Sequence, residues 1–166
     1  MIILGIDPGY AIVGFGAVDY KGSRFNLIEY GAVTTEAGEN FEQRLKKVYD
    51  GVSEVIDRIK PESLAIEKLF FTTNQKTAID VAQARGVTVL AAIQRGIPVF
   101  EYTPLQVKQS IVGYGKAEKR QVMEMVKVIL HLEKIPRPDD AADAVALAIC
   151  HAHCAGSLLG KNIKLK

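Results

Sequence analysis

The sequence opens with Met1-Ile2-Ile3-Leu4-Gly5-Ile6-Asp7-Pro8-Gly9, an apolar run that ends abruptly at a carboxylate. A continuous apolar run rich in β-branched residues predicts a central strand covered on both faces, because a half-solvated strand would alternate apolar with polar residues. Pro8 lacks the N–H that a sheet ladder needs, so the strand should finish at Asp7. The run therefore predicts a buried strand with a carboxylate at its end, although Asp-Pro-Gly is also a common turn sequence.

The length and composition of the chain limit what it can be. Its 166 residues suffice for one domain with a sizeable core, so we expect a single domain over residues 1–156. A basic tail would follow over residues 157–166, for which nonspecific electrostatic attraction and disorder both stay open. No apolar stretch is long enough to span a membrane, and no secretory signal is present, which predicts a cytoplasmic protein with no membrane partner. The net charge of +2 is too small to indicate a nucleic-acid partner by itself.

Two further strands follow the opening run. Residues 11–18 and 24–33 are mainly apolar and are separated by a turn-like segment at residues 19–23. Short connections predict an antiparallel meander, because a parallel pair needs a crossover of about a dozen residues or more. From Phe41 to Ile59 the apolar positions then follow helical spacing, and Pro61 ends that helix.

A second short apolar run, Ser63-Leu64-Ala65-Ile66-Glu67, also ends in a carboxylate. The preceding helix provides a crossover long enough for this strand to lie parallel to the first strand. Parallel neighbours would bring Asp7 and Glu67 to the same end of the sheet.

The rest of the chain continues to alternate between helical and extended patterns. It predicts a helix over residues 77–95, a last strand over 97–102, two helices separated by Gly113-Tyr114-Gly115-Lys116, and a final helix from near Pro138. The second of the two helices should run to about His131. The fold class expected from these elements is α/β, with a five-stranded mixed sheet flanked by helices.

The final helix carries two acids at its start. Asp140 and Asp143 are three residues apart, so both project from one helix face. Aspartate at a helix N-terminus often only caps free amides and complements the helix dipole. Asp143 fits that explanation poorly, because it is surrounded by alanines in a helix that looks largely buried, and a buried carboxylate without a partner is costly.

The acids suggest a metal site if they converge. Crowded carboxylates are tolerated only with protons or cations between them, and oxygen ligands without His or Cys favour Mg²⁺ or Mn²⁺ over zinc. Four acids could hold two divalent ions about 4 Å apart, an arrangement that cleaves phosphodiesters without a protein nucleophile. The four candidates are Asp7, Glu67, Asp140 and Asp143.

A second group of potential ligands lies at the end of the final helix. His151 and Cys154 are three residues apart and could share a helix face, but no matching cluster supplies the remaining zinc ligands. Cys150 and Cys154 are expected to be reduced thiols rather than a structural disulfide. We therefore expect no zinc site here.

Six segments resemble, in the same order, motifs of the RuvC family of bacterial Holliday-junction resolvases. They are Ile3-Leu4-Gly5-Ile6-Asp7-Pro8-Gly9, Ala65-Ile66-Glu67, Gln83-Ala84-Arg85-Gly86, Gln106-Val107-Lys108-Gln109, Ala117-Glu118-Lys119-Arg120-Gln121-Val122 and Asp140-Ala141-Ala142-Asp143-Ala144. The resemblance extends over nearly the whole chain, to about Cys154. Each motif is weak alone, and their joint order makes the signal specific.

The resemblance implies an RNase H-like nuclease domain and a homodimer that cuts four-way DNA junctions symmetrically in recombination and repair. It implies two Mg²⁺ ions per subunit, for which Mn²⁺ substitutes, and branch-migration proteins as partners. It assigns metal binding to Asp7, Glu67, Asp140 and Asp143. Asp140 is preferred over Asp139 because its spacing to Asp143 matches the family, which leaves Asp139 as the expected helix cap.

Basic residues flank the glycine-rich segment between the two late helices. Such residues usually form a solvated face. The resemblance, however, matches Lys108 and Lys119 to positions that bind phosphate near the scissile bond, and we place Arg120 on the same DNA-binding surface.

Two adjacent aromatic residues, Phe70 and Phe71, lie in the polar segment after Glu67. Both rings could pack into the core, as most such pairs do. Phe70 matches the aromatic position of the family, so we expect it to stack on an unpaired base and Phe71 to pack inside.

The helix expected over residues 77–95 is the best candidate for a dimer interface, because Ala78, Ala82 and Gly86 permit close helix approach.

Two other functions are rivals to a junction-cutting nuclease. An actin-like ATPase would need two such domains, and this chain supplies one. A nonenzymatic junction-binding protein of the same fold stays as the alternative.

Overall fold

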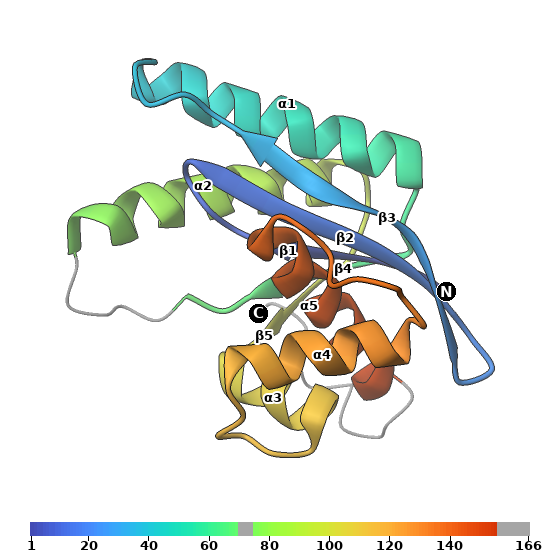
Figure 1. Cartoon of the computed structure of the whole chain (residues 1–166). Helices are drawn as coiled ribbons and strands as arrows, with labels where there is room; N and C mark the ends of the chain where they lie inside the picture. The colour runs from blue at the N-terminus through green and yellow to red at the C-terminus, as the bar shows by residue number, and fades with distance from the viewer. Residues whose placement is uncertain (70–74, 156–166) are drawn as a thin grey trace.

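The computed structural model describes residues 1–69 and 75–155, which form a five-stranded mixed sheet with helices on both faces (Figure 1). The strands are β1 (Ile2–Asp7), β2 (Ile12–Lys21), β3 (Arg24–Thr34), β4 (Ser63–Glu67) and β5 (Val99–Tyr102). The helices are α1 (Phe41–Ile59), α2 (Gln75–Gln94), α3 (Pro104–Val112), α4 (Lys119–Ile129) and α5 (Asp139–Ala155). Three predictions lie outside the described residues: Phe70, Phe71 and the basic tail at 157–166.

The sheet has the strand order β3-β2-β1-β4-β5, with β1 at its centre. β1 to β3 form the predicted antiparallel meander, and β4 pairs in parallel with both β1 and β5. Pairing of Ile6 with Ile66 places Asp7 and Glu67, the next residue of each strand, at the same end of the sheet. Both topological predictions are confirmed.

The core has two halves, one on each face of the sheet (Figure 1). Leu4 and Ile6 of β1 point into the half covered by α1 and α2, whereas Ile3 points into the half covered by α3, α4 and α5. All three side chains are fully buried. The continuous apolar run at the N-terminus is explained by this double burial, because neither face of β1 meets solvent.

The structure corrects the turn expected at residues 19–23. β2 and β3 stay paired as far as Lys21 and Arg24, and only Gly22 and Ser23 form the turn, with φ of 53° and 67°. A two-residue hairpin whose central residues both have positive φ matches the right-handed twist of paired strands. The polar residues before the turn therefore belong to strand β2.

Two other boundaries differ from the sequence patterns. β5 starts at Val99 rather than at residue 97, because Gly96 takes a left-handed turn with φ of 71° and Pro98 has no N–H to donate. α4 was expected to reach about His131 and ends at Ile129, since His131 has a φ of 53° that no α-helix contains.

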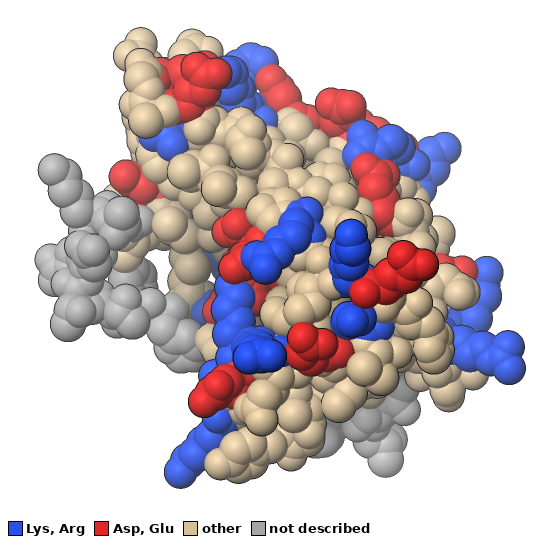
Figure 2. Space-filling model, in the orientation of Figure 1, with Lys and Arg blue, Asp and Glu red and all other residues tan. Residues whose placement is uncertain are grey.

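Charged side chains of both signs are mixed over the face drawn in Figure 2. This mixture agrees with a net charge of only +2. Among the residues that the structure describes, no helix combines the length and apolar character needed to cross a membrane.

Candidate active site

Two neighbouring strands end at the candidate site. Side chains alternate between the faces of a strand. Ile6 and Ile66 both point toward α1 and α2, so Asp7 and Glu67 lie on the face that α5 covers. The strands thus present two carboxyl groups, side by side, to the start of the last helix.

Glycines in the sheet allow α5 to lie directly on β1 and β2. A β-carbon on Gly5 would come within 1.9 Å of the carbonyl oxygen of Ala144, and one on Gly16 within 2.3 Å of the Val145 side chain. Facing Gly5 on α5 are Ala144 and Ala148, and the other alanines of this helix, Ala141, Ala142 and Ala146, are also almost fully buried. This close approach brings Asp140 and Asp143 to the strand-end acids.

The four acids influence one another electrostatically. Burial raises the pKa of Asp7 from 3.8 to about 7, and the charges of Glu67, Asp143 and Asp140 add to the rise. Burial and the charge of Asp143 also raise the pKa of Glu67. Carboxyl groups that raise each other's pKa in a partly buried place are typical of a functional site.

The chemistry of these donors fits a hard divalent cation such as Mg²⁺ or Mn²⁺, which prefers carboxylate oxygens. Within residues 1–69 and 75–155, no three His, Cys, Asp or Glu side chains converge closely enough to hold one metal ion. The four acids therefore lie near one another, but no three of them converge on one point.

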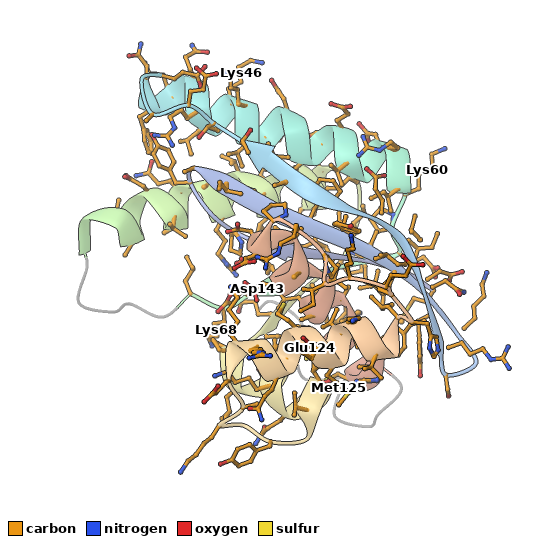
Figure 3. All side chains as sticks on the ribbon, viewed as in Figure 1. Lys46, Lys60, Lys68, Glu124, Met125 and Asp143 are labelled. Atoms are coloured by element: carbon orange, nitrogen blue, oxygen red, sulfur yellow. The ribbon has the colours of Figure 1, made fainter. Side chains whose placement is uncertain are left out.

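Lys119 forms an ion pair with the acid cluster. Its Nζ lies 2.7 Å from Oδ2 of Asp143, which is labelled on α5 in Figure 3. This hydrogen bond raises the pKa of Lys119, and burial raises the pKa of Asp143 while Lys119 opposes that rise. The backbone N–H of Glu118 donates to the side chain of Gln121 at 2.8 Å, which fixes the start of α4.

A cavity of about 230 Å³ adjoins the acids. Lys108 of α3 lines it together with Lys119, Glu67 and Asp143, so two of the predicted DNA contacts lie beside two of the predicted acids. Arg120 is exposed and does not line this cavity. The remaining walls are apolar and come from α3, α4 and α5: Pro104, Val107, Val122, Met123, Ala146 and Leu147.

The expected helix-cap role of Asp139 is wrong. α5 begins at Asp139 itself, and the carbonyl oxygen of Pro138 accepts hydrogen bonds from the N–H groups of Ala141 and Ala142. The Asp139 carboxylate is instead paired with Arg137. The acid still lies in the first turn, where it complements the helix dipole.

Sequence reasoning gave no role to Arg85, which appeared only within a motif. The structure pairs its guanidinium with Glu101 of β5, and its Nε donates to the carbonyl oxygen of Glu67 at 3.4 Å. A single arginine within an alanine-rich helix was the available signal, because a largely buried charge requires a partner.

The residues considered for zinc have packing roles. The Tyr102 hydroxyl lies 2.7 Å from Nδ1 of His151, whose ring also stacks against Phe100. Cys150 and Cys154 are free thiols, as predicted.

A mixed sheet whose central parallel strands end in acids, completed by acids from a C-terminal helix, defines the RNase H-like class. The family model of crossover junction endodeoxyribonuclease RuvC matches residues 3–151. The chain therefore belongs to the RuvC family.

Relatives with that name match over nearly the full length. The protein of Clostridioides difficile is 59% identical over 164 residues, covering 99% of this chain and 96% of its own. The protein of Ruminiclostridium cellulolyticum is 55% identical, covering 98% and 99%. The structure of T. thermophilus RuvC in complex with Holliday junction substrate has a TM-score of 0.90 at 36% identity, covering 99% of this chain and 100% of that one. The yeast mitochondrial resolvase Ydc2 shares the fold, with a TM-score of 0.64 at 11% identity.

Proposed function

We propose that this protein is a structure-selective endonuclease that resolves four-way (Holliday) DNA junctions by paired symmetric nicks, in homologous recombination and DNA repair. Family membership and full-length similarity to a RuvC protein solved with junction DNA support this activity. The observation that carries it is the set of four interacting acids at the ends of β1 and β4 and the start of α5, next to a cavity lined by two lysines.

In the proposed reaction, Asp7, Glu67, Asp140 and Asp143 hold two Mg²⁺ ions per subunit, and Mn²⁺ substitutes for them. The bound cations would supply an activated water and stabilisation of the departing oxygen, so no protein nucleophile is needed. The protein contributes the placement of the acids, which depends on the parallel pairing of β1 with β4 and on the seating of α5.

Lys108 and Lys119 would hold the phosphate whose ester bond is cut, because both line the cavity beside Glu67 and Asp143. Phe70 and Arg120 are proposed as further DNA contacts, Phe70 by stacking on an unpaired base. Residues 1–156 would form the nuclease domain, acting in the cytoplasm with branch-migration proteins of the same pathway.

A homodimer would supply the two active sites that paired cuts require, because a four-way junction and an isologous dimer share two-fold symmetry. Helix α2 presents apolar side chains to solvent: Ile79, Leu90 and Ile93 are 56%, 48% and 55% exposed. Gly86 lies on the same stripe, where a β-carbon would meet nothing within 4 Å. Positions 79, 86, 90 and 93 follow the spacing of a helix-packing seam.

The alternative is a nonenzymatic junction-binding protein, which the family does not favour. Replacing Asp7 with Asn separates the two. An endonuclease should lose cutting while the variant still binds a synthetic four-way junction, because the change removes one carboxylate and no basic residue. A wild-type protein that binds the junction but never cuts it in Mg²⁺ would establish the binder.

A further inference from the structure

Lys119 makes a contact within the site that a role in DNA binding does not explain. Its ammonium group lies 2.7 Å from Oδ2 of Asp143. Within the described part of the chain, no other ion pair includes one of the four acids. Lys119 therefore supplies the positive charge that the acid cluster bonds directly.

This ion pair fixes the direction of the Asp143 carboxylate. A carboxylate that accepts a hydrogen bond from an ammonium group is held on the side where that group lies. Asp143 is held toward α4 in this way. A divalent cation on Asp143 would lie close to the ammonium group and repel it.

The side chain of Lys119 can move away from Asp143. Its side chain is 55% exposed, whereas that of Asp143 is 30% exposed. Lys119 lies in the first turn of α4, whose start is fixed by Glu118 and Gln121, so the flexible side chain can change direction while the helix stays in place. The cavity that it lines offers a second position within its reach.

We propose that Lys119 is a built-in counter-ion that bonds Asp143 in the metal-free protein and is displaced toward the cavity when a divalent cation binds. This inference rests on the proposed function, since the released lysine would then hold the substrate phosphate. It makes Lys119 a positioning residue for Asp143 before it contacts DNA. The cation and Lys119 compete for the Asp143 carboxylate. Binding of one cation would therefore both gather the acids around the metal and release Lys119 to bind phosphate.

Calorimetric titration of the DNA-free protein with Mn²⁺ alone tests this competition. Lys119→Met should bind Mn²⁺ about 2–5-fold more tightly than wild type, the range expected when a partly exposed ion pair no longer competes. Lys108→Met is the matched control, because it removes the same charge from the same cavity but breaks no ion pair with an acid in the described residues. Lys119→Arg keeps the ion pair and should retain an affinity close to that of wild type.

Melting temperatures provide a second readout that does not depend on cutting. Without divalent cations Lys119→Met should melt earlier than Lys108→Met, and Mn²⁺ should raise its melting temperature by more. Equal Mn²⁺ affinities for the two methionine variants, or weaker binding by Lys119→Met, would overturn the counter-ion role. Junction cutting by the wild-type protein would stand in that case, so failure of this inference differs from failure of the proposed function.

Discussion

Gly14 of β2 lies directly against Asp140 of α5, so closely that a β-carbon on Gly14 would come within 2.1 Å of the Asp140 carbonyl oxygen. The contact is with backbone, which cannot rotate away as a side-chain tip can. Gly5 and Gly16 make similar contacts farther along α5. These three glycines set the distance between α5 and the sheet, and hence the separation of Asp140 from Asp7.

The first prediction follows from that contact. Gly14→Ala should push the start of α5 away from the sheet, lowering stability by about 1–3 kcal/mol, the usual cost of overpacking. Junction cleavage should fall by more than the unfolded fraction explains, because Asp140 moves with the helix. Gly38→Ala is the control, since its β-carbon would meet nothing within 4 Å. Unfolding midpoints and cleavage rates of the two variants decide the matter, and normal cutting by folded Gly14→Ala would contradict the expectation.

The second prediction concerns the pH dependence of stability. The pKa of Asp7 is raised from 3.8 to about 7, so the folded protein binds this proton more tightly than the unfolded chain does. The stability of the metal-free protein therefore falls as pH rises through this interval. Asp7→Asn cannot ionise and should be more stable than wild type at about pH 8, by about 1–2 kcal/mol, with a smaller difference near pH 4. Denaturant unfolding in a chelator measures both values.

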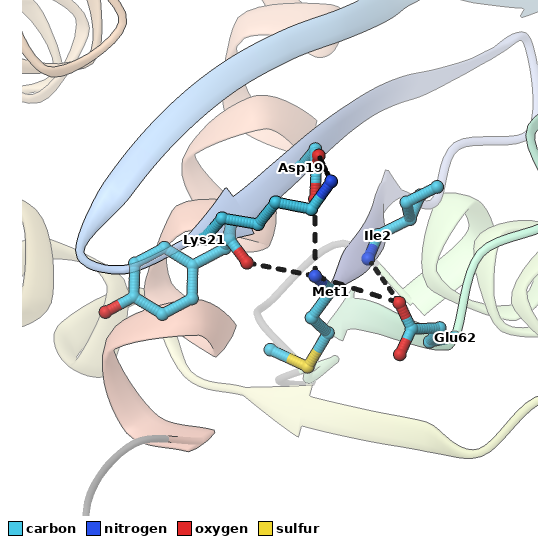
Figure 4. A network of polar contacts seen from close by, with 6 residues as sticks. Met1, Ile2, Asp19, Lys21 and Glu62 are labelled. Atoms are coloured by element: carbon cyan, nitrogen blue, oxygen red, sulfur yellow. Dashed lines mark hydrogen bonds and ion pairs between the residues drawn. The ribbon is translucent and has the colours of Figure 1, made fainter.

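Asp19 offers a control of opposite sign for that experiment. It lies in a network with Lys21 and the N-terminal amine of Met1, which also approaches Glu62 (Figure 4). The hydrogen bond from Lys21 is the main cause that lowers the pKa of Asp19. Its contribution is present above the ordinary pKa and is lost as pH falls, so Asp19→Asn should not stabilise the protein at neutral pH. Stabilisation by both variants would show that the Asp7 effect is not specific.

The third prediction concerns the buried pair of Tyr102 and His151. Burial lowers the pKa of His151 to about 4, so its ring is neutral near pH 7 and Nδ1 can accept from the Tyr102 hydroxyl. Tyr102→Phe leaves that nitrogen unpaired and should cost about 1–3 kcal/mol. Ser110→Ala removes a hydrogen bond to the exposed His153 ring and should change stability little. Equal unfolding free energies for the two variants would contradict the buried role.

The fourth prediction tests the proposed dimer. Leu90→Lys places a charge on the exposed apolar stripe of α2 and should halve the mass measured by light scattering at micromolar concentration. Val128→Lys is the control, because Val128 is 62% exposed on α4, away from α2. The monomeric variant should lose paired nicks. A monomeric wild-type protein with full activity would contradict the interface.

The sequence was sufficient for the features that depend on local pattern. Apolar runs ending in acids predicted both central strands, and the intervening helix predicted their parallel pairing, which placed Asp7 beside Glu67. Contacts that depend on how the helices pack against one another could not be predicted from the sequence. The bond between Lys119 and Asp143 joins residues 24 positions apart and requires α4 to lie against α5. The cap of α5 was missed because the helix begins one residue earlier than the pattern indicated, so that Asp139 lies inside its first turn.

The most direct test is cutting by wild-type protein in Mg²⁺ of a synthetic four-way junction and of a linear duplex with the same sequences. We predict nicks at symmetric positions in two opposing strands of the junction, an intact linear duplex, and no cutting when Mg²⁺ is chelated. Equal cutting of the linear duplex, or an intact junction after full binding in Mg²⁺, would contradict a structure-selective nuclease built on these four acids.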